Sequence, residues 1–284
     1  MLILNFSKII ATSLLMSQLI GCALSPKMAN SRIVSDDLLA KQLVVVEQAL
    51  AKLPQGERTV LYIGSAQHSQ SLAFQGDVLL AQKQLKAINP KLQSIILSNE
   101  IQTSQLIYPF ATLHTLTQTF DRVAELSKKY PLKVVVLIST HGNVDVLSST
   151  VANESYTHIQ SKHLQPWLDA LGNTPTAVIL SACYSGSFLP ALSRLDNGQR
   201  LVLTAAAANR NSFGCAYQSE NTHFIGALFG PEFDPGKTWQ HNFDAAKLTI
   251  EKKEIALGLA PASNPQSSIP AGLAQVSVAD FIKP

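Results

Sequence analysis

Short apolar runs alternate with longer segments of helical periodicity along most of the chain. The runs are rich in β-branched residues and occupy 58–64, 94–98, 133–140, 177–182 and 200–206. Continuous apolar runs of this length are typical of strands that are buried on both faces, as in the parallel sheets of α/β proteins. The pattern therefore predicts an α/β fold built on a mostly parallel central sheet.

Helices are predicted between these runs, where apolar residues recur at helical spacing. The predicted helices are 36–53, 74–88, 112–130, 158–171, 185–192, 222–229 and 238–257. Asn89-Pro90 and Pro131 end the second and third of them. The segment 26–35 has the composition of a polar tether, and 276–282 could add an edge strand to the sheet.

Two of the predicted strands end abruptly at reactive side chains. One leads into Thr140-His141-Gly142 and the other into Ala182-Cys183. The chain between them has room for a loop and one helix, so the two strands are expected to be parallel neighbours whose carboxyl ends share one edge. Open α/β sheets place their functional sites at that edge. We therefore expect His141 and Cys183 to lie together there.

An imidazole close to a thiol has a clear chemical use. A cysteine reacts as the thiolate, and a nearby histidine supplies both the base and the positive partner. The helix predicted to open at Ser185 would favour the thiolate through its dipole. Gly142 leaves its backbone N–H unobstructed, so that it could bind an oxyanion together with the N–H of Cys183. This is the chemistry of acyl transfer from a peptide bond.

These residues also resemble a known family. Thr140-His141-Gly142 and Ser181-Ala182-Cys183-Tyr184-Ser185-Gly186-Ser187, each after an apolar strand, resemble the legumain-like cysteine peptidases, relatives of caspases and gingipains. The segments 108–112 and 204–215 strengthen the match, which covers roughly residues 58 to 230. The resemblance implies a caspase-like three-layer sandwich with a mostly parallel sheet and helices on both faces, occupying residues 58–284.

The resemblance further implies a cysteine endopeptidase that acts on a peptide or protein substrate. Cys183 would be the nucleophile, His141 the base, and the N–H groups of Gly142 and Cys183 the oxyanion donors. No metal or organic cofactor is needed for this chemistry. A metal site is not expected at His158 and His163 either, because they are five residues apart and no carboxylate or cysteine cluster accompanies them.

The substrate pocket departs from the family pattern. Legumains cut after Asn and use pocket groups of both charges, but Ser181 and Ala227 stand where the family has acids. Asn211 replaces a small hydroxyl residue, and Ser212 follows it in the predicted specificity loop. Losing polar partners weakens discrimination steeply. We therefore expect a neutral or broader preference at the residue before the cut (P1).

The N-terminus has the pattern of a targeting segment at residues 1–21. Lys8 precedes an apolar stretch, and Leu19-Ile20-Gly21-Cys22 resembles a bacterial lipobox, which implies cleavage before Cys22 and its lipidation. Ala23 fits transport to an outer membrane, so the protein is expected on the periplasmic side of a bacterial envelope with residues 22–57 as tether and N-terminal helix. A plain secretory signal or an uncleaved anchor remains open.

Charge and cysteine usage narrow the remaining choices. The net charge of +3 is small and dispersed, which argues against a nucleic-acid partner. Downstream of the N-terminus no apolar run is long enough to span a bilayer. With Cys22 lipidated, Cys183 and Cys215 remain; they could form a structural or reversible disulfide, or Cys183 could be catalytic beside a free Cys215.

Three further questions stay open. Ser185 could serve a serine acyl hydrolase, although the Gly-x-Ser-x-Gly elbow is missing. The chain could also be an idle lipoprotein that only binds protein partners. Within the loop 64–70, Gln67 or Ser69 is the candidate to orient His141, while His68 is expected to be a surface histidine.

Overall fold

The computed structural model describes residues 26–54, 56–100, 106–152, 154–193, 198–216 and 218–283. The predicted signal peptide at 1–21 and the predicted lipidation site Cys22 lie outside the described residues. The division of the chain at residues 21 and 57 therefore stays a prediction. None of the described helices is both long and apolar enough to cross a bilayer.

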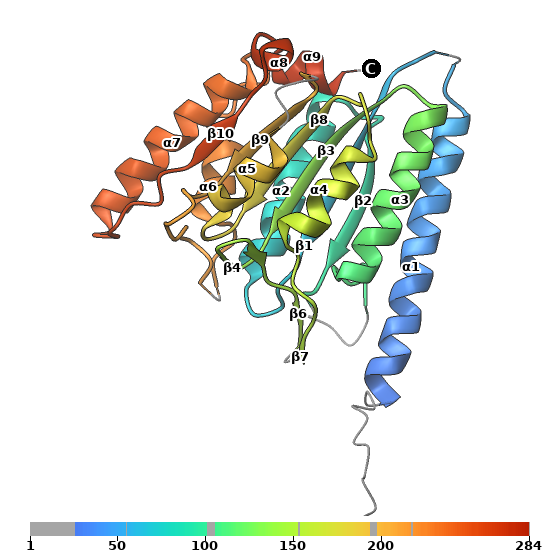
Figure 1. The fold of residues 1–284 in the computed structure, drawn as a ribbon, viewed down its shortest axis with the longest axis horizontal. Coiled ribbons are helices and arrows are strands. Elements are labelled where there is room, and N and C mark those ends of the chain that lie inside the picture. The colour runs from blue at the N-terminus through green and yellow to red at the C-terminus, as the bar shows by residue number, and fades with distance from the viewer. Residues whose placement is uncertain are drawn as a thin grey trace, which may run out of the picture.

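A six-stranded sheet with the order β10-β9-β8-β3-β1-β2 forms the centre of the fold (Figure 1). The strands are β1 (Thr59–Ala66), β2 (Gln93–Ser98), β3 (Leu132–Ser139), β8 (Thr176–Ser181), β9 (Arg200–Thr204) and β10 (Gln266–Ser268). All neighbours are parallel except β10, which pairs antiparallel with β9. The predicted mostly parallel sheet is confirmed.

Helices cover both faces of this sheet (Figure 1). One face packs against α1 (Pro26–Ala51), α3 (Leu113–Lys129), α4 (Ser161–Asp169) and α5 (Leu189–Leu192), the last preceded by the 3₁₀ turn η1 (Ser185–Phe188). The other face packs against α2 (Leu72–Ile88), α6 (His223–Leu228), α7 (Trp239–Ala256), α8 (Ala271–Ala274) and α9 (Val278–Ile282). The three-layer architecture predicted for the chain is therefore confirmed.

The central strand β3 shows why the apolar runs are continuous. Val134, Val136 and Ile138 belong to the core beneath α1 and α3, whereas Val135 and Leu137 belong to the core beneath α2 and α7. Successive side chains of a strand point to opposite faces, so a strand that is covered on both faces must be apolar at every position.

The helix α1 corrects the predicted tether at 26–35, because the helix already begins at Pro26. Proline is tolerated at the first helical position, where its missing N–H is not needed. Further along, Val46 and Leu50 pack into the core. The Gln42 amide donates to the Ile96 carbonyl and accepts from the Ile96 N–H, at 2.9 and 2.8 Å, and so covers the exposed edge of β2.

The C-terminal segment is also corrected. The predicted edge strand at 276–282 is wrong, since α9 occupies Val278–Ile282 and the edge strand is β10. The Ser277 hydroxyl caps α9 by accepting from the Asp280 N–H at 3.0 Å. Val278, Phe281 and Ile282 are buried at helical spacing. A short apolar run fits a strand and a helix equally well, and here the cap and the packing favour the helix.

The predicted polar loop after His141 contains two short hairpins. They are formed by β4 (Gly142–Asn143) with β5 (Val146–Leu147), and by β6 (Thr150–Val151) with β7 (Glu154–Ser155). The Leu147 and Ile159 backbones exchange two hydrogen bonds of 2.8 and 2.9 Å, which joins the first hairpin to the chain before α4. This loop is therefore held at the carboxyl edge of the sheet.

Candidate active site

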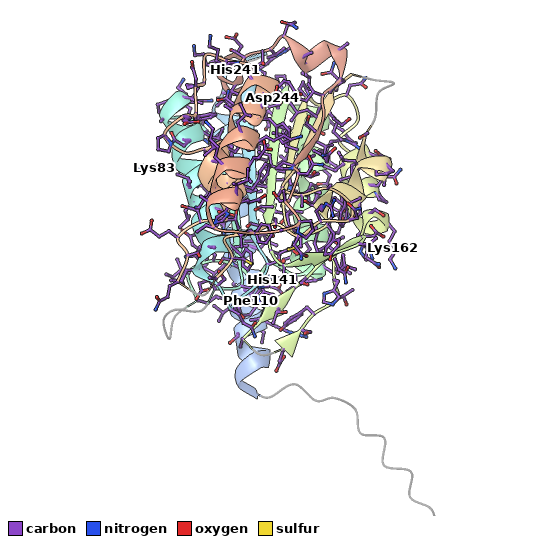
Figure 2. All side chains as sticks on the ribbon, turned by 90° about the vertical axis from the view of Figure 1, so that its left-hand side faces the viewer. Lys83, Phe110, His141, Lys162, His241 and Asp244 are labelled. Carbon is purple, nitrogen blue, oxygen red and sulfur yellow. The ribbon has the colours of Figure 1, made fainter. Side chains whose placement is uncertain are left out.

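The register of β3 and β8 brings His141 and Cys183 to the same edge. Ser139 pairs with Ser181 in this parallel ladder. The Thr140 N–H then donates to the Ser181 carbonyl at 3.0 Å, one residue beyond the strand. His141 and Cys183 each follow two residues after the paired serines, so both leave the sheet at the same level. Figure 2 labels His141 in the lower part of the folded chain.

Gly142 allows the segment after β3 to lie directly against the segment after β8. A Cβ atom at this position would lie 2.3 Å from the Cys183 carbonyl oxygen and 3.0 Å from the Ala182 Cβ. These distances are shorter than any van der Waals contact, so a side chain would force the two backbone segments apart. The glycine after the histidine is therefore required by the close approach of the segment that carries Cys183.

Cys183 lies at the turn where β8 passes into η1. Tyr184 adopts a left-handed conformation with φ of 57°, which is unusual for a residue with a side chain. The Tyr184 N–H donates to the Arg210 carbonyl at 2.7 Å. The Cys183 sulfur is half-buried and accepts from the Ser212 N–H at 3.3 Å. The turn at Tyr184 and the loop that follows β9 therefore fix the position of the sulfur at the carboxyl edge of the sheet.

His141 is half-buried against two rings. The Phe74 ring, from α2, meets the imidazole edge-to-face, with centroids 4.9 Å apart and planes at 82°. The His68 ring meets it in the same way at 4.6 Å and 85°. Burial lowers the pKa of His141 below its ordinary value of 6.5. The ring is therefore neutral at neutral pH and able to accept a proton.

His68 itself corrects the prediction of a surface histidine. It is only 9 % exposed, because the hairpin loop after His141 covers it and its backbone bridges to Thr150. Neither of the two residues considered as orienting groups is hydrogen-bonded to His141, and the Gln67 Oε1 is buried without a partner. The Gln67 amide donates to Ser65 at 3.4 Å, and the Ser69 hydroxyl donates to the Ala152 carbonyl at 2.9 Å.

The predicted pocket residues separate into two groups. Ser212 contacts the sulfur of Cys183, and Asn211 lies exposed beside it. Ser181 is buried beneath the rim. Ala227 lies on α6 and lines a cavity of about 450 Å³ with Glu220, His223 and Lys253. The structure thus brings Ser212 to the Cys183 sulfur, whereas Ala227 faces a cavity between α6 and α7.

Asp77 is a buried acid that the sequence patterns did not single out. Its carboxylate accepts from the hydroxyls of Ser139, Ser181 and Thr222 at 2.6, 3.2 and 2.8 Å, and from the Thr222 N–H at 2.9 Å. It therefore joins α2 to β3, to β8 and to Thr222, the N-cap residue of α6. Its helical spacing after Phe74, on the apolar face of α2, was the available signal.

Gly76 makes this arrangement sterically possible. A Cβ at position 76 would lie 1.8 Å from the Glu220 carbonyl oxygen. The absence of a side chain lets α2 approach the backbone just before α6, which brings the Asp77 carboxylate within reach of Thr222. The four hydrogen bonds satisfy the carboxylate although it is fully buried.

We expect ionisation of the buried Asp77 to lower the free energy of unfolding as the pH rises. The Asp77→Asn variant, which cannot ionise at this position, should not show this decrease. Burial raises the pKa of Asp77 from 3.8 to about 6, so the folded state binds this proton more tightly than the unfolded chain. The group's stabilising contribution is therefore complete below its unfolded pKa of 3.8 and is lost as pH rises through about 6. Urea unfolding should show the wild type losing about 3 kcal/mol relative to the variant between pH 3.5 and pH 7. A stability difference independent of pH would contradict this.

The two described cysteines, Cys183 and Cys215, are both free thiols. Burial raises the pKa of Cys215 above its ordinary value, and the neighbouring Cys183 adds to the shift. The described residues contain no group of three or more His, Cys, Asp or Glu side chains arranged to hold a metal ion.

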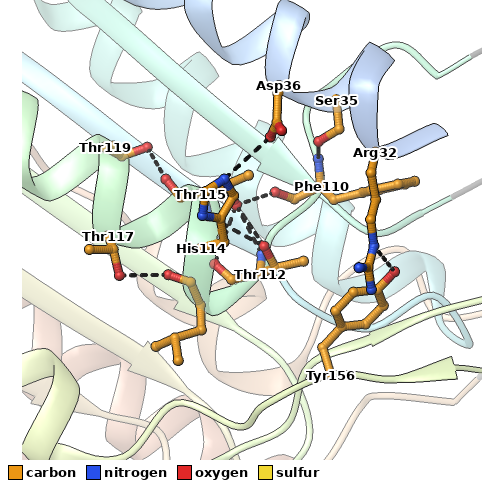
Figure 3. Close-up of polar contacts among 11 residues, drawn as sticks. Arg32, Ser35, Asp36, Phe110, Thr112, His114, Thr115, Thr117, Thr119 and Tyr156 are labelled. Carbon is orange, nitrogen blue, oxygen red and sulfur yellow. Dashed lines mark hydrogen bonds and ion pairs between the residues drawn. The ribbon is translucent and has the colours of Figure 1, made fainter. Parts of the chain in front are cut away.

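Another cavity, of about 430 Å³, lies between α1, the start of α3 and the loop before α4 (Figure 3). Its polar groups bind one another. Arg32 donates to the Tyr156 hydroxyl at 3.4 Å, and Asp36 pairs with His114 at 3.7 Å. The Phe110 N–H donates to the Ser35 hydroxyl at 2.8 Å. These contacts join α1 to the chain that follows His141 and leave Cys183 outside the cavity.

One comparison with known proteins identifies a family for this chain. The model of the peptidase C13 family matches residues 115–263, which is just over half of the chain and includes both His141 and Cys183. A comparison with curated proteins gave no match. Among solved structures, caspase-1 from Spodoptera frugiperda is similar with a TM-score of 0.49 and 15 % identity, over 75 % of this chain and 86 % of that chain.

Proposed function

The chain belongs to the peptidase C13 family and is a legumain-like cysteine endopeptidase, and from this premise we propose that Cys183 is its nucleophile and His141 its general base. The observation that carries the assignment is the parallel pairing of Ser139 with Ser181, two residues before each of the two side chains. The contact between Gly142 and the Cys183 backbone supports it.

The reaction would proceed through a thioester. His141 takes the thiol proton, and the Cys183 sulfur attacks the scissile carbonyl carbon. The N–H groups of Gly142 and Cys183 stabilise the resulting oxyanion. When the tetrahedral intermediate collapses, the C–N bond breaks and His141 donates its proton to the leaving amine. A water molecule, deprotonated by His141, then attacks the thioester, which releases the acid and returns the free thiol.

The serine alternative has less support. The Ser185 side chain is fully buried, and its hydroxyl accepts from the Ala206 N–H at 3.2 Å. A nucleophile must be reachable by the substrate carbonyl, and Cys183 is the more exposed of the two. Ser185 therefore serves better as a structural contact between η1 and the end of β9.

We also propose that the enzyme is tethered to a bacterial outer membrane through a lipid on Cys22, facing the periplasm. The lipobox pattern at 19–22 is the basis of this proposal. The position of α1 is consistent with it, because the helix begins four residues after Cys22 and contacts the catalytic edge through Arg32 and Tyr156. The tether would then leave the domain at the edge that carries His141.

Alkylation with mass mapping tests both proposals on one sample. Protein purified from bacterial membranes is treated with limiting iodoacetamide at neutral pH and digested. We expect Cys183 to be labelled at least tenfold faster than Cys215, because the burial that raises the pKa of Cys215 keeps it protonated. The N-terminal peptide should begin at Cys22 and carry the mass of a diacylglyceryl group.

Turnover of a peptide panel that varies P1 completes the experiment. Cleavage after several uncharged P1 residues would support the endopeptidase and its predicted pocket, whereas a sharp preference for Asn alone would contradict the pocket assignment. Equal labelling of the two cysteines with no turnover would instead favour the idle binding protein. An N-terminal peptide without lipid would refute the tether alone.

A further inference from the structure

The loop that follows β1 is fixed from three directions. The Gln67 N–H donates to the Ser139 carbonyl at 3.1 Å, one residue beyond the paired strands. The Gln67 carbonyl accepts from the Thr150 N–H at 2.9 Å and from the Asn99 side chain at 2.8 Å. These bonds tie the loop to β3, to the hairpins after His141 and to the chain after β2. The backbone of His68 is therefore held at the catalytic edge.

The His68 side chain points into this edge. Its ring contacts His141 at 4.6 Å and Phe74 at 6.1 Å, and Phe74 contacts His141 at 4.9 Å, so the three rings touch one another. Edge-to-face contacts at these distances are favourable and depend on ring orientation. The catalytic imidazole thus lies against two aromatic walls, one from the loop after β1 and one from α2.

No hydrogen bond orients the His141 ring among the described residues, and the buried Gln67 Oε1 at the same edge has no partner. Histidine bases usually donate their second ring N–H to a carboxylate or an amide oxygen, which selects the tautomer and the rotamer. Within the described ranges, neither a side chain nor a backbone oxygen accepts from the His141 ring. The carboxylate of Asp77, a buried acid that contacts β3 and β8, already accepts hydrogen bonds from the hydroxyls of Ser139, Ser181 and Thr222.

We propose that His68 is the positioning residue for His141 and acts through edge-to-face ring packing, with Phe74 as the opposing wall. His68 contacts no reacting atom in this proposal; it restricts the imidazole to the orientation that faces Cys183. The inference rests on the proposed role of His141 as the base, and it answers how that base is oriented without a carboxylate or amide partner.

The charge state of His68 suits this role. The Gln70 N–H donates to its Nδ1 at 3.3 Å, which leaves the proton of the neutral ring on Nε2. Burial, with a further contribution from His141, lowers the pKa of His68 to about 4. A neutral ring at this place does not repel the imidazolium that forms when His141 takes the proton of Cys183. Among the titratable groups, His68 contacts the His141 ring, and Asp77 of α2 lies beneath it, bonded to Ser139 and Ser181. The Phe74 ring of α2, which also contacts His141, carries no charge.

Three substitutions separate ring packing from other roles. His68→Phe keeps an aromatic ring but removes both nitrogens, whereas His68→Leu fills the space without a ring and His68→Ala leaves it open. We expect the Leu and Ala variants to lower kcat about tenfold or more while KM changes less than threefold, since proper alignment of a catalytic group governs the rate. We expect the Phe variant to recover most of the kcat.

The pH profile supplies a readout that a purely structural role would not move. Burial lowers the pKa of His141, so opening its surroundings in His68→Ala should raise that pKa toward 6.5 and move the acid limb of kcat/KM to higher pH. In His68→Phe the limb should stay at its wild-type position. His241→Ala is the matched control, because His241 is exposed on α7, far from His141 in Figure 2, and its loss should change neither quantity.

Two outcomes would overturn the proposal. If the Leu and Ala variants retain wild-type kcat and acid limb, His68 has no positioning role. If the Phe variant is as impaired as the Leu variant, an imidazole nitrogen rather than the ring is required. Titration of the His141 ring by NMR, assigned through His141→Ala, measures the same pKa shift without any substrate. This keeps the proposal testable even if the peptide panel shows no turnover.

Discussion

Cys183→Ala should lower kcat for peptide cleavage by about 10⁴-fold or more, because the acyl-enzyme cannot form without the sulfur. His141→Ala should be almost as severe, since proton transfer and thiolate formation both depend on the imidazole. KM should change little in either variant. The measurement is steady-state cleavage of the best peptide in the panel, with thermal unfolding to establish that each variant is folded.

Cys215→Ala is the matched control for the loss of a thiol. Cys215 packs against the core beneath α2 and α7, and its removal should leave kcat near the wild-type value. Activity that survives in Cys183→Ala and His141→Ala but disappears in Ser185→Ala would instead establish the serine hydrolase. The double variant of Cys183→Ala and His141→Ala should lose no more kcat than the more impaired single variant, because both residues act in one step.

Gly142→Ala should lower kcat/KM by about 100-fold, a large effect for the addition of one methyl group, because small displacements of reacting groups are costly. The added Cβ, which is fixed directly to the backbone, would lie 2.3 Å from the backbone carbonyl oxygen of Cys183. Neither can rotate away as a side chain could. The strand ends must therefore separate, which moves the imidazole away from the sulfur and displaces both proposed oxyanion donors.

Gly226→Ala is the control for the same chemical change. In α6 an added Cβ would meet only the Asn221 Cβ, at an ordinary 3.6 Å. Alanine also favours a helix over glycine. This variant should keep wild-type activity and stability. Full activity in Gly142→Ala, measured beside it, would show that Gly142 does not join the two catalytic segments as the contact suggests.

The strands, and the shared edge at which His141 and Cys183 follow them, could be predicted because their causes are local. An apolar run covered on both faces is recognisable in the sequence, and its abrupt end at a reactive residue marks the carboxyl edge. Segments whose structure depends on a distant partner were less predictable. The N-terminal turns of α1 read as a polar tether, yet Ser35 binds the Phe110 backbone and Arg32 binds Tyr156.

Residues deep in the site show the same limit more sharply. Asp77 differs from a solvated helix acid only through Ser139, Ser181 and Thr222, which are 62 to 145 positions away in the chain. His68 lies in a polar loop that resembles any connecting segment. Only the stacking of that loop under the hairpins buries its ring against His141.

The sequence by itself determined the parallel α/β sheet and the shared edge to which His141 and Cys183 are brought, because strand burial and strand ends leave periodic and local signals. Tertiary structure alone decided what surrounds those side chains: two rings against the imidazole, one backbone N–H against the sulfur and one buried carboxylate beneath both strands. The reason is physical. Desolvation, ring contacts and hydrogen bonds between distant segments arise only when the layers pack, and they leave no local pattern in the chain.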